Sequence, residues 1–509
     1  MEAPFRSGLH HVTLITRRVQ ANVDFYVGFL GLSLVKRTGG FEDNTQLHLF
    51  YGDPQGSPGS LVTFFAWEDG ASGRVGTGQV SEIAFAVPAA TMGDWLTRAL
   101  THRVPVEGPA REMGEPVLRL KDPDGIIVKL VGRDLPDPRP QSVGPLRAIT
   151  LLTDTPEETA RFLTRFGYRP GPRQGSIQRL VSETDAVDVR DATGYVPGVP
   201  GTGTADHVAF RAPDVAAVEA AEDALRAYNR SPTTVHDRKY FTSLYVREPG
   251  GALLELATDG PGFALDEPAG HLGETLFVPH AEPERAEDLK LLLPQFALPG
   301  QPRIPLRDLP FVHRFHVPET PDGSTLVLLH GTGGDEADLM PLARRAEPHA
   351  TLLGVRGRAH EEGTTRWFRR IAGDVVDQAD IAAEAEAFAA FVTGAAESFG
   401  LDRDATTFLG LSNGANFLAA FMGLYPGLVR RAVLIRPMLV LDPPPAPDLS
   451  GVDVLMLVGA QDPFAARAPA LAAWLNAAGA RLETRTLPAG HGLVPEDRAA
   501  IAEWLVLRT

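Results

Sequence analysis

Apolar and polar positions alternate over short runs in the first half of the chain, as in β-strands with one buried face. Three stretches recur there in the same order, and a repeated order indicates an internal duplication. The matched pairs are GLHHVTLIT (8–16) with PLRAITLLT (145–153), IAFAVPAATM (83–92) with VAFRAPDVAA (208–217), and LKDPDGIIVKLVG (120–132) with VREPGGALLELAT (246–258). We therefore expect one copy over residues 1–135 and a second over 143–262.

Each copy divides again into two similar modules. In the first module, a strand at 9–15 precedes a helical pattern that ends at Gly31. Three strand-like runs then follow, namely LSLVKR, QLHLFYGD and SLVTFFAW. The helix is recognised by its 3.6-residue period and the strands by alternation and β-branched content. The first half of the chain is therefore predicted to contain four βαβββ modules.

The pattern changes near residue 322. Apolar strands such as STLVLL, ATTFLG and VDVLMLVG alternate with helical runs, and the longest of these runs ends at Gly400. Buried strands that alternate with helices predict a parallel, doubly wound α/β sheet over residues 310–509, with FVHRFHV as a candidate first strand. The stretch 263–309 contains LPGQPRIPLRDLP and is predicted to be a linker or tail. The chain is thus expected to combine α+β and α/β domains.

Composition narrows the classes of function. The chain has 48 basic and 64 acidic residues and a formal net charge of −16, which argues against nucleic acid or an anionic membrane as partner. The absence of cysteine excludes disulfides, cysteine-bound metals and thiol nucleophiles. We find no leader pattern and no apolar run near the roughly 20 residues of a membrane span. A cytoplasmic enzyme that acts on small molecules is the expectation.

The four-module pattern resembles the vicinal oxygen chelate, or glyoxalase-like, superfamily, and within it the hydroquinone-type ring-cleaving dioxygenases. The resemblance covers about residues 5–300. It is carried by LHHVTLIT, DFYVGFLGLSLVKR, HLFYGD, GSLVTFF, DRKYFTSLYVREPGGALLELATD and PGFALDEP. It implies modules whose first and last strands curl into a cup and carry the metal ligands.

At those strand positions the first module offers His11, and the fourth offers His207 and Glu255. Two imidazoles and one carboxylate form the facial triad of non-haem Fe(II) oxygenases, which leaves three coordination positions open for O₂ and a phenolate. The expected cofactor is therefore Fe(II), with Mn(II) as an alternative. The second module has Glu82 and Lys129, which we interpret as a structural ion pair or as solvated charges.

His10 and His11 are neighbours on one predicted strand. Neighbouring strand residues point to opposite faces, so only one of them can face the cup squarely. His11 aligns with Ala148 of the second copy, and it takes the place in its module that the ligand of the fourth module has. We therefore expect His11 to be the ligand and His10 to pack beside it or support it. Thr13 and His48 are candidates for the pocket, and His48 is also a rival ligand.

The resemblance also assigns work near the metal to Arg238 and Tyr245. An arginine can hold an anionic substrate oxygen, and a tyrosine can orient or pass a proton. The alternatives are a surface charge and a core aromatic. Relatives often have a second histidine just before the residue equivalent to His207, whereas this chain has Asp206. Because the ordinary pKa of Asp is about 4 and that of His about 6.5, the identity of the acid–base group stays open.

A second candidate site is Ser412, in GLSNG between the strand ATTFLG and the helical run ANFLAAFMGLY. A G-x-S-x-G in this context is a nucleophile elbow, where small residues allow a tight turn. Asp462 and His491 follow in the chain order of an α/β-hydrolase triad. The loop LLHGTGG supplies a further donor, so the backbone N–H groups of Thr332 and Asn413 are the predicted oxyanion hole.

Residues 310–509 resemble the compact phospholipase/carboxylesterase group of α/β-hydrolases, which includes acyl-protein thioesterases. Their length implies an open site without a large lid. In TTRWFRR, Trp367 and Phe368 are candidates for lining the acyl pocket or for the core. Arg366, Arg369 and Arg370 would suit a substrate that carries a carboxylate.

These features together predict a bifunctional enzyme of quinol catabolism or detoxification. The first part would cleave a hydroquinone-like ring with O₂ beside a hydroxyl group, and the second would hydrolyse an ester, thioester or related acyl bond through Ser412. One alternative keeps the hydrolase and makes residues 1–262 a module that binds aromatic ligands without oxygen chemistry. Another gives the duplicated half a structural role in dimerisation. A homodimer is compatible with each interpretation.

Overall fold

The computed structural model describes residues 8–43, 45–135, 139, 141–228, 234–279, 283–303, 309–372 and 375–507. The chain divides into two units, Met1–Arg303 and Ile304–Thr509. The first unit contains the four predicted modules, and each module provides one strand, a helix and three further strands. Among the described residues, no helix is both long enough and apolar enough to span a bilayer.

The first and fourth modules share a nine-stranded sheet of order β14-β15-β16-β13-β1-β4-β3-β2-β17. Its strands are β1 (Leu9–Thr16), β2 (Ser33–Gly39), β3 (Leu47–Gly52), β4 (Leu61–Ala66), β13 (Ala205–Ala212), β14 (Val235–Asp237), β15 (Phe241–Arg247), β16 (Leu253–Pro261) and β17 (Leu276–Phe277). β1 pairs antiparallel with β13, and Thr13 lies opposite His207. This pairing joins the two sequence copies in one sheet.

The second and third modules share an eight-stranded sheet of order β10-β11-β12-β9-β5-β8-β7-β6. Its strands are β5 (Gln79–Pro88), β6 (Val106–Glu112), β7 (Glu115–Lys121), β8 (Ile127–Arg133), β9 (Leu146–Thr153), β10 (Arg169–Gln174), β11 (Ile177–Val181) and β12 (Ala186–Asp191). The central pair, β5 with β9, again joins the two copies. The copies at 1–135 and 143–262 are therefore sequence repeats whose strands combine in both sheets.

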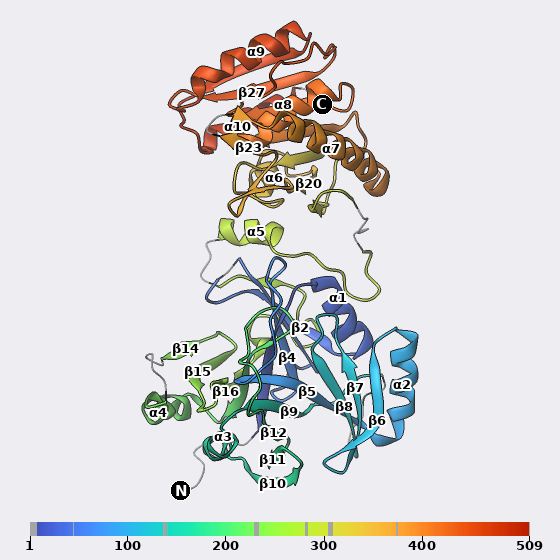
Figure 1. Ribbon diagram of the computed structural model, residues 1–509, viewed down its shortest axis with the longest axis vertical. Coiled ribbons are helices and arrows are strands. Elements are labelled where there is room, and N and C mark those ends of the chain that lie inside the picture. Colours follow the sequence, from blue (N-terminus) through green and yellow to red (C-terminus); the bar gives the residue numbers. More distant parts are fainter. Residues whose placement is uncertain are drawn as a thin grey trace. The chain divides into compact units, whose positions relative to one another are not determined.

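Helices cover the outer faces of these sheets, with α2 beside β6 and α4 beside β15 (Figure 1). They are α1 (Val19–Val23), continued by the π-helix η1 (Asp24–Phe29), α2 (Met92–Thr101), α3 (Pro156–Leu163), α4 (Val215–Arg226), and the 3₁₀ turns η2 (Ala89–Thr91), η3 (Thr164–Phe166) and η4 (Phe263–Leu265). Gly31, with φ +73°, follows the first of these helices. That left-handed conformation is one that glycine adopts freely, so the predicted helix end is confirmed.

Successive residues of the central strands face alternately toward the apolar core and toward the site. Val12 and Leu14 of β1 and Val208 and Phe210 of β13 are buried in the main apolar core of the unit. The residues between them on β1, such as Thr13, point to the opposite face, which lines the cup of the sheet. All eight residues of β1 are buried, so the polar face is enclosed as well.

Residues 263–303 belong to the first unit, contrary to the prediction of a linker over 263–309. β17 pairs with β2, and α5 (Pro283–Leu292) follows it. Leu293 is buried in the main core, and Phe296 and Leu298 pack against that core. The prolines and glycines set turns between short elements, while the apolar residues among them are buried. Of the rest of the predicted linker, residues 304–308 lie outside the described residues, and Leu309 packs against the core of the second unit.

The second unit is built on a seven-stranded sheet of order β18-β20-β19-β25-β26-β27-β28, in which only β18 is antiparallel. Its strands are β18 (His313–His316), β19 (Thr325–Leu329), β20 (Thr351–Val355), β25 (Thr406–Leu411), β26 (Arg431–Ile435), β27 (Asp453–Gly459) and β28 (Arg481–Leu487). Two small hairpins are formed by β21 (Ala359–Glu361) with β22 (Thr364–Arg366) and β23 (Arg370–Ala372) with β24 (Val375–Val376). The predicted doubly wound sheet and its candidate first strand are both present.

The helices of the second unit follow its strands in the expected alternation. They are α6 (Met340–Ala346), α7 (Gln378–Phe399), α8 (Asn413–Leu424), the 3₁₀ turn η5 (Ala465–Arg467), α9 (Ala468–Ala477) and α10 (Pro495–Val506). The carboxylate of Asp377 accepts hydrogen bonds from the first backbone N–H groups of α7, and Gly400 ends this helix with φ +66°. α8 begins directly after β25, so the elbow sequence lies between a buried strand and a buried helix.

Candidate functional site

The cup of the nine-stranded sheet brings three buried side chains together. Nε2 of His11 lies 3.3 Å from Nε2 of His207. Oε2 of Glu255 lies 3.2 Å from the first of these nitrogens and 2.9 Å from the second. The three residues are at most 6% exposed. They come together because β1, β13 and β16 are adjacent strands.

The triangle of donor atoms fits a single metal ion. Adjacent corners of an octahedron with bonds of about 2.1 Å lie about 3.0 Å apart, close to the three observed separations. The Ser243 hydroxyl donates to Oε1 of Glu255, which leaves Oε2 for a cation. Two imidazoles and one carboxylate on one face leave the opposite coordination positions open.

Hydrogen bonds set which nitrogen of each imidazole is free to bind a cation. Nδ1 of His207 donates to Asp206 at 2.6 Å, so Nε2 can carry the lone pair. Nε2 of His10 donates to the Thr258 carbonyl at 3.1 Å, because a carbonyl can only accept. Burial lowers the pKa of His10 to about 3, so this ring is neutral and its Nδ1 accepts from Nδ1 of His11 at 2.9 Å. Nε2 of His11 is thereby left free.

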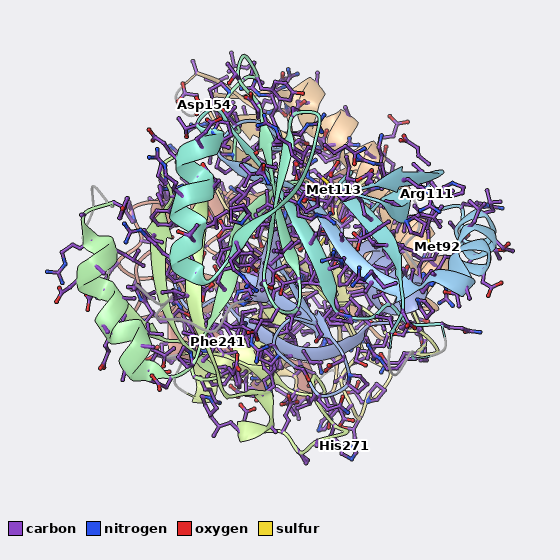
Figure 2. The ribbon with its side chains drawn as sticks, turned by 90° about the horizontal axis from the view of Figure 1, so that it is seen from below. Met92, Arg111, Met113, Asp154, Phe241 and His271 are labelled. Carbon is purple, nitrogen blue, oxygen red and sulfur yellow. The ribbon has the colours of Figure 1, made fainter. Side chains whose placement is uncertain are left out.

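A β-bulge explains how both neighbouring histidines reach the site. The register between β1 and β13 slips between Leu9 and His11. A bulge of this kind turns the extra residue out of strict alternation, and here it brings His10 to the edge of the cup. The ring of Phe241, labelled in Figure 2, packs 5.3 Å from the ring of His10 and 5.4 Å from that of His11. The expectation that His10 supports the ligand agrees with this geometry.

The charges of the cluster are coupled. Burial would raise the pKa of Glu255, but the adjacent imidazoles of His11 and His207 outweigh it and keep that pKa well below its usual range. Burial lowers the pKa of His11. Burial also acts to lower the pKa of His207, but hydrogen bonds to Asp206 and Glu255 prevail and raise it to about 9. Without a bound cation, His207 is therefore protonated at neutral pH.

We expect the affinity for a divalent metal to rise about tenfold per pH unit up to about pH 9 and then to level off. The nitrogen of His207 must release its proton before it binds a cation, and its pKa in the free site is about 9. Isothermal titration with Mn²⁺ between about pH 6.5 and 9.5 measures this dependence. In Asp206→Asn the plateau should begin at a lower pH, because an amide stabilises the imidazolium less. An affinity that does not vary with pH would contradict the assignment.

Further polar side chains line the cup. Thr13 Oγ1 lies 2.9 Å from Nε2 of His207 and 2.8 Å from Oγ1 of Thr63. Nε2 of His48 hydrogen-bonds Thr63 Oγ1 at 2.9 Å, and its ring lies between those of Phe50 and Phe65. His48 is thus placed behind a threonine and outside the three-residue cluster. This position agrees with a lining residue rather than with a rival ligand.

Tyr245 and Arg238 reach the same cup from β15 and the loop before it. The Tyr245 ring lies 5.5 Å from that of His207, and the Arg238 guanidinium lies 5.6 Å from the Tyr245 ring. Arg238 also donates to Glu42 at 2.8 Å. Burial raises the pKa of Tyr245, so the phenol is protonated at neutral pH. The structure therefore places a cation and a phenolic donor beside the candidate metal centre.

The cup of the eight-stranded sheet carries different residues at the positions that are equivalent to the candidate metal ligands. At the three ligand positions the repeat alignment gives it Ala148, Glu82 and Lys129. The Lys129 ammonium lies 2.9 Å from Glu82 and 3.1 Å from Glu112. The predicted structural ion pair is thus present, and a fixed ammonium supplies the positive charge in this cup.

In the second unit, Ser412 occupies a strained turn. It follows β25 directly and has φ +51°, a conformation that residues with a side chain rarely adopt. A Cβ on Gly410 would lie 2.7 Å from the nitrogen of Ala415, and one on Gly414 would clash with the Leu329 carbonyl. The flanking glycines are therefore required by close backbone contacts, as expected for a nucleophile elbow.

Two hydrogen bonds connect the three residues predicted as a triad. Ser412 Oγ lies 2.8 Å from Nε2 of His491, and Nδ1 of His491 lies 2.9 Å from Asp462. The Asp462 carboxyl is 3% exposed, whereas the His491 ring is 37% exposed. These hydrogen bonds thus lead from a buried carboxylate to a hydroxyl that solvent can approach, which is the arrangement of a base-activated serine.

The glycine-rich loop after β19 is held beside this elbow. Gly357 N–H donates to Nε2 of His330 at 2.9 Å, and the Trp367 indole donates to the His330 carbonyl at 2.9 Å. The backbone N–H of Trp367 donates to the Asn413 side chain at 2.8 Å. These bonds keep the loop that carries Thr332 next to the start of α8. The oxyanion role of the Thr332 and Asn413 N–H groups stays a prediction.

Trp367 does not line an acyl pocket. It is fully buried, and its ring stacks on those of Phe417 at 5.0 Å and Phe311 at 6.0 Å. Phe368 is buried with it. Large aromatic surfaces are most stable against other aromatic side chains, so the pair belongs to the core beside the helices α7 and α8. The core alternative for both residues is the correct one.

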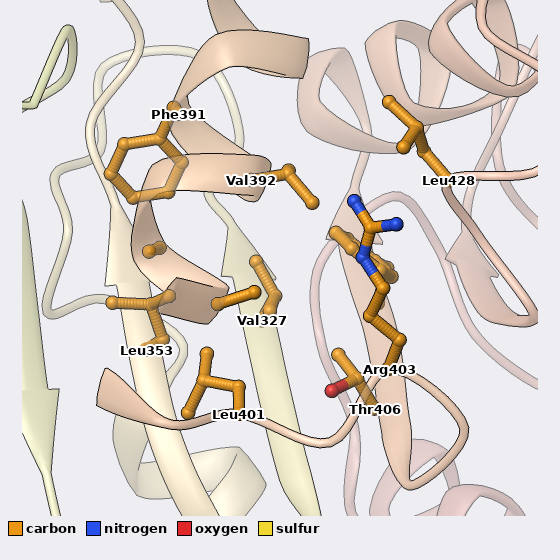
Figure 3. Close-up of a pocket in the computed structure, with 11 residues that line it drawn as sticks. Val327, Leu353, Phe391, Val392, Leu401, Arg403, Thr406 and Leu428 are labelled. Atoms are coloured by element: carbon orange, nitrogen blue, oxygen red, sulfur yellow. The ribbon is translucent and has the colours of Figure 1, made fainter. Parts of the chain in front are cut away.

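A small apolar pocket in this unit lies away from Ser412. Its lining includes Val327, Leu353, Phe391, Arg403 and Thr406 (Figure 3). Thr406 begins β25, whereas Ser412 follows the end of that strand. Six strand residues span about 20 Å, so this pocket lies near the start of the parallel strands, whereas Ser412 lies at their other end.

Comparison with known proteins identifies the family. The model of the Glyoxalase/Bleomycin resistance protein/Dioxygenase superfamily matches residues 8–130. The protein "Putative ring-cleaving dioxygenase MhqO" of Bacillus subtilis is 35% identical over 300 residues, which cover 56% of this chain and 96% of that protein. The chain belongs to the glyoxalase/dioxygenase superfamily.

Two further relatives agree with this assignment. "Chlorohydroquinone/hydroquinone 1,2-dioxygenase" of Sphingobium indicum is 29% identical over 317 residues, covering 57% of this chain and 98% of that protein. A crystal structure described as a putative dioxygenase from Bacillus subtilis has a TM-score of 0.54 and 33% identity, covering 58% of this chain and 98% of its own. Ring-cleaving dioxygenases are thus relatives along their whole length.

The chain also belongs to a hydrolase family. "Putative hydrolase MhqD" of Bacillus subtilis is 34% identical over 183 residues, which cover 36% of this chain and 92% of that protein. The second unit has the α/β-hydrolase sheet and the serine elbow. This member of the glyoxalase/dioxygenase superfamily is therefore fused to an α/β-hydrolase.

Sequence reasoning missed several residues that shape the two sites of this superfamily member. Ser243 orients Glu255, and the signal for it was its place two residues before Tyr245, on the same strand face. Thr63 occupies on β4 the position that Glu255 has on β16, but it lies within the apolar run VTFF. His330 lies in the glycine-rich loop LLHGTGG. No sequence signal identifies its hydrogen bonds.

Proposed function

We propose that this protein is a bifunctional enzyme. Its first unit would cleave a hydroquinone-like ring with O₂ at Fe(II), and its second unit would hydrolyse an ester, thioester or related acyl bond. The observation that carries the first activity is the buried triangle of His11, His207 and Glu255 with one open face. The name of the Sphingobium indicum relative supports a hydroquinone substrate.

Each residue of the cup has a role in this proposal. Ferrous iron, or Mn(II) in its place, would supply a redox centre at which a phenolate and O₂ meet. The three ligands carry one negative charge, so a divalent ion keeps a net positive charge that favours an ionised phenol. Asp206 is engaged with Nδ1 of His207 at 2.6 Å, and we therefore assign it to positioning rather than to acid–base transfer.

Substrate recognition falls to the side chains around the ligands. Arg238 would hold the anionic oxygen of the substrate, since its guanidinium lies over the ring of Tyr245, which is next to His207. Tyr245, protonated at neutral pH, would orient that oxygen by a hydrogen bond. Phe241 and His48 would form the walls against the aromatic ring, because the Phe241 ring lies 5.4 Å from that of His11 and the His48 ring 4.4 Å from that of Phe65.

We expect protein loaded anaerobically with Fe(II) to consume O₂ when hydroquinone is added and not when catechol is added. The reason is that Arg238 and Tyr245 would hold a single substrate oxygen at the ion, whereas a catechol would bring two adjacent oxygens to it. An oxygen electrode with a panel of substituted hydroquinones measures this preference. Absence of uptake with every member of the panel, by protein that holds iron, would refute the oxygenase proposal. Binding of the same phenols without uptake would favour a ligand-binding module.

The hydrolase proposal rests on the hydrogen bonds that connect Ser412, His491 and Asp462. Ser412 would attack the acyl carbon, His491 would take its proton, and Asp462 would hold the imidazole in the required tautomer. Arg366 is the best placed of the three candidate arginines for a carboxylate-bearing substrate, because its guanidinium lies 3.4 Å from the Thr332 hydroxyl. All three arginines pair with acidic side chains, Arg366 and Arg370 with Glu361 and Arg369 with Asp380.

A further inference from the structure

We propose that Arg436 is a positioning residue for hydrolysis, which fixes His491 without touching the substrate. This inference rests on the proposed hydrolase function of the second unit. Arg436 is the residue directly after β26, and its side chain is fully buried. None of the sequence motifs includes it.

The end of β26 holds both members of the Ser412–His491 pair. The backbone N–H of Ser412 donates to the carbonyl of Ile435 at 2.8 Å. The next residue, Arg436, has φ +54°, a left-handed conformation that non-glycine residues rarely adopt. Ile435 therefore holds the backbone of Ser412, and the next residue, Arg436, extends its guanidinium toward the loop that carries His491.

The guanidinium of Arg436 holds this loop on both sides of His491. Its Nε donates to the Gly490 carbonyl at 2.8 Å, and its Nη2 donates to the Gly492 carbonyl at 3.2 Å. These are the residues immediately before and after His491, and as glycines they have no side chain with which to anchor the loop. Charge-assisted hydrogen bonds to both neighbours restrict where the imidazole between them can lie.

Asp497 completes the arrangement. It accepts two hydrogen bonds from Arg436, both at 2.9 Å, and both side chains are fully buried. The same carboxylate accepts from the backbone N–H of Val494 at 2.9 Å, at the start of α10. The loop, the strand end and the helix are therefore connected through one buried ion pair.

The position of this ion pair points to function rather than to stability alone. An apolar pair of similar volume is often at least as stabilising as a buried ion pair. Apolar side chains, however, cannot donate to two backbone carbonyls. The hydrogen bond between Ser412 and His491 is 2.8 Å long, and a displacement of about 1 Å at a catalytic group can cost about 100-fold in rate.

The first step of the test separates this inference from the proposed function. Wild-type protein is treated with a fluorophosphonate, and the labelled peptide is identified by mass spectrometry. Failure to label Ser412 would refute the hydrolase proposal itself. With labelling established, the inference is tested by ester turnover of variants.

Arg436→Ala is expected to lower kcat by about 100-fold with KM within about twofold of wild type. The matched control is Arg481→Ala. Arg481 makes the same two-bond pair with Asp453, at 2.8 and 2.7 Å, but its side chain is 61% exposed. The control is expected to keep wild-type kcat. Equal kcat in Arg436→Ala and wild type would overturn the inference.

Chemical rescue distinguishes positioning from a general loss of structure. Guanidinium chloride at millimolar concentration is expected to raise the kcat of Arg436→Ala by at least about tenfold, because the ion can form hydrogen bonds to Asp497 and to the two carbonyls. Urea, which lacks the charge, should not. A folded Arg436→Ala protein whose kcat guanidinium does not restore would overturn the inference. If this variant does not fold, Asp497→Asn is used, and a kcat unchanged from wild type in that variant would overturn it as well.

Discussion

Replacing Glu255 by glutamine is expected to lower bound iron from about one ion per chain to less than about a tenth of that. Glu255 supplies the negative charge of the donor triangle, and its carboxyl is fully buried. Without it, a divalent cation would sit in a buried site between two neutral imidazoles, where its desolvation is poorly compensated. O₂ uptake with hydroquinone should disappear in proportion. Metal content is measured by mass spectrometry of the digested protein and uptake by an oxygen electrode.

Glu82→Gln is the matched control, because it makes the same change at a ligand position of the other cup. Its carboxylate pairs with Lys129 at 2.9 Å and with Arg119 at 2.6 Å. Loss of these ion pairs should lower thermal stability, but metal content and O₂ uptake per folded chain should stay at the wild-type level. If Glu255→Gln keeps its metal, the proposed centre is wrong. Loss of metal from both variants would show that misfolding, not ligation, is being measured.

Replacing Ser412 by alanine is expected to reduce hydrolysis of a short p-nitrophenyl ester by at least about 1,000-fold. The alanine removes the oxygen that lies 2.8 Å from His491, so the base has no nucleophile to activate. Iron content and O₂ uptake should be unchanged, because the centre of the first unit is built entirely from β1, β13 and β16.

Ser450→Ala is the control for this variant, since Ser450 is an exposed serine in the same unit. It should hydrolyse the ester like wild type. Residual activity of Ser412→Ala above about a tenth of wild type would mean that another group is the nucleophile. Parallel loss of O₂ uptake would contradict the independence of the two sites.

The duplicated strand patterns and the nucleophile elbow could be read from the sequence because they are local. Alternation in LHHVTLIT identifies a strand, and GLSNG between an apolar strand and a helix identifies a tight turn. Alternation was less reliable for His10, because a bulge between Leu9 and His11 changes where that side chain lies. A bulge depends on the partner strand, which local periodicity does not specify.

Local sequence misled at one place and left two alternatives open at another, for the same physical reason. Proline and glycine in 263–303 suggested a linker, yet Leu293 of this stretch is buried in the main core. Trp367, a candidate for the acyl pocket, stacks on Phe417 and Phe311 instead. In both cases the surface that covers an apolar side chain comes from distant parts of the chain, so burial could not be inferred from neighbouring residues.

The sequence by itself determined the four modules and the order of serine, aspartate and histidine, and together with the family resemblance it identified His11, His207 and Glu255 as candidate ligands. Only the tertiary structure decided that the first module pairs with the fourth, which brings His11 and His207 together across 196 residues. It also decided which ring nitrogens are free, and that Arg436 holds the two glycines beside His491. The physical reason is that periodicity reports the face on which a side chain lies, whereas strand pairing and hydrogen bonds between distant segments depend on how the whole chain packs.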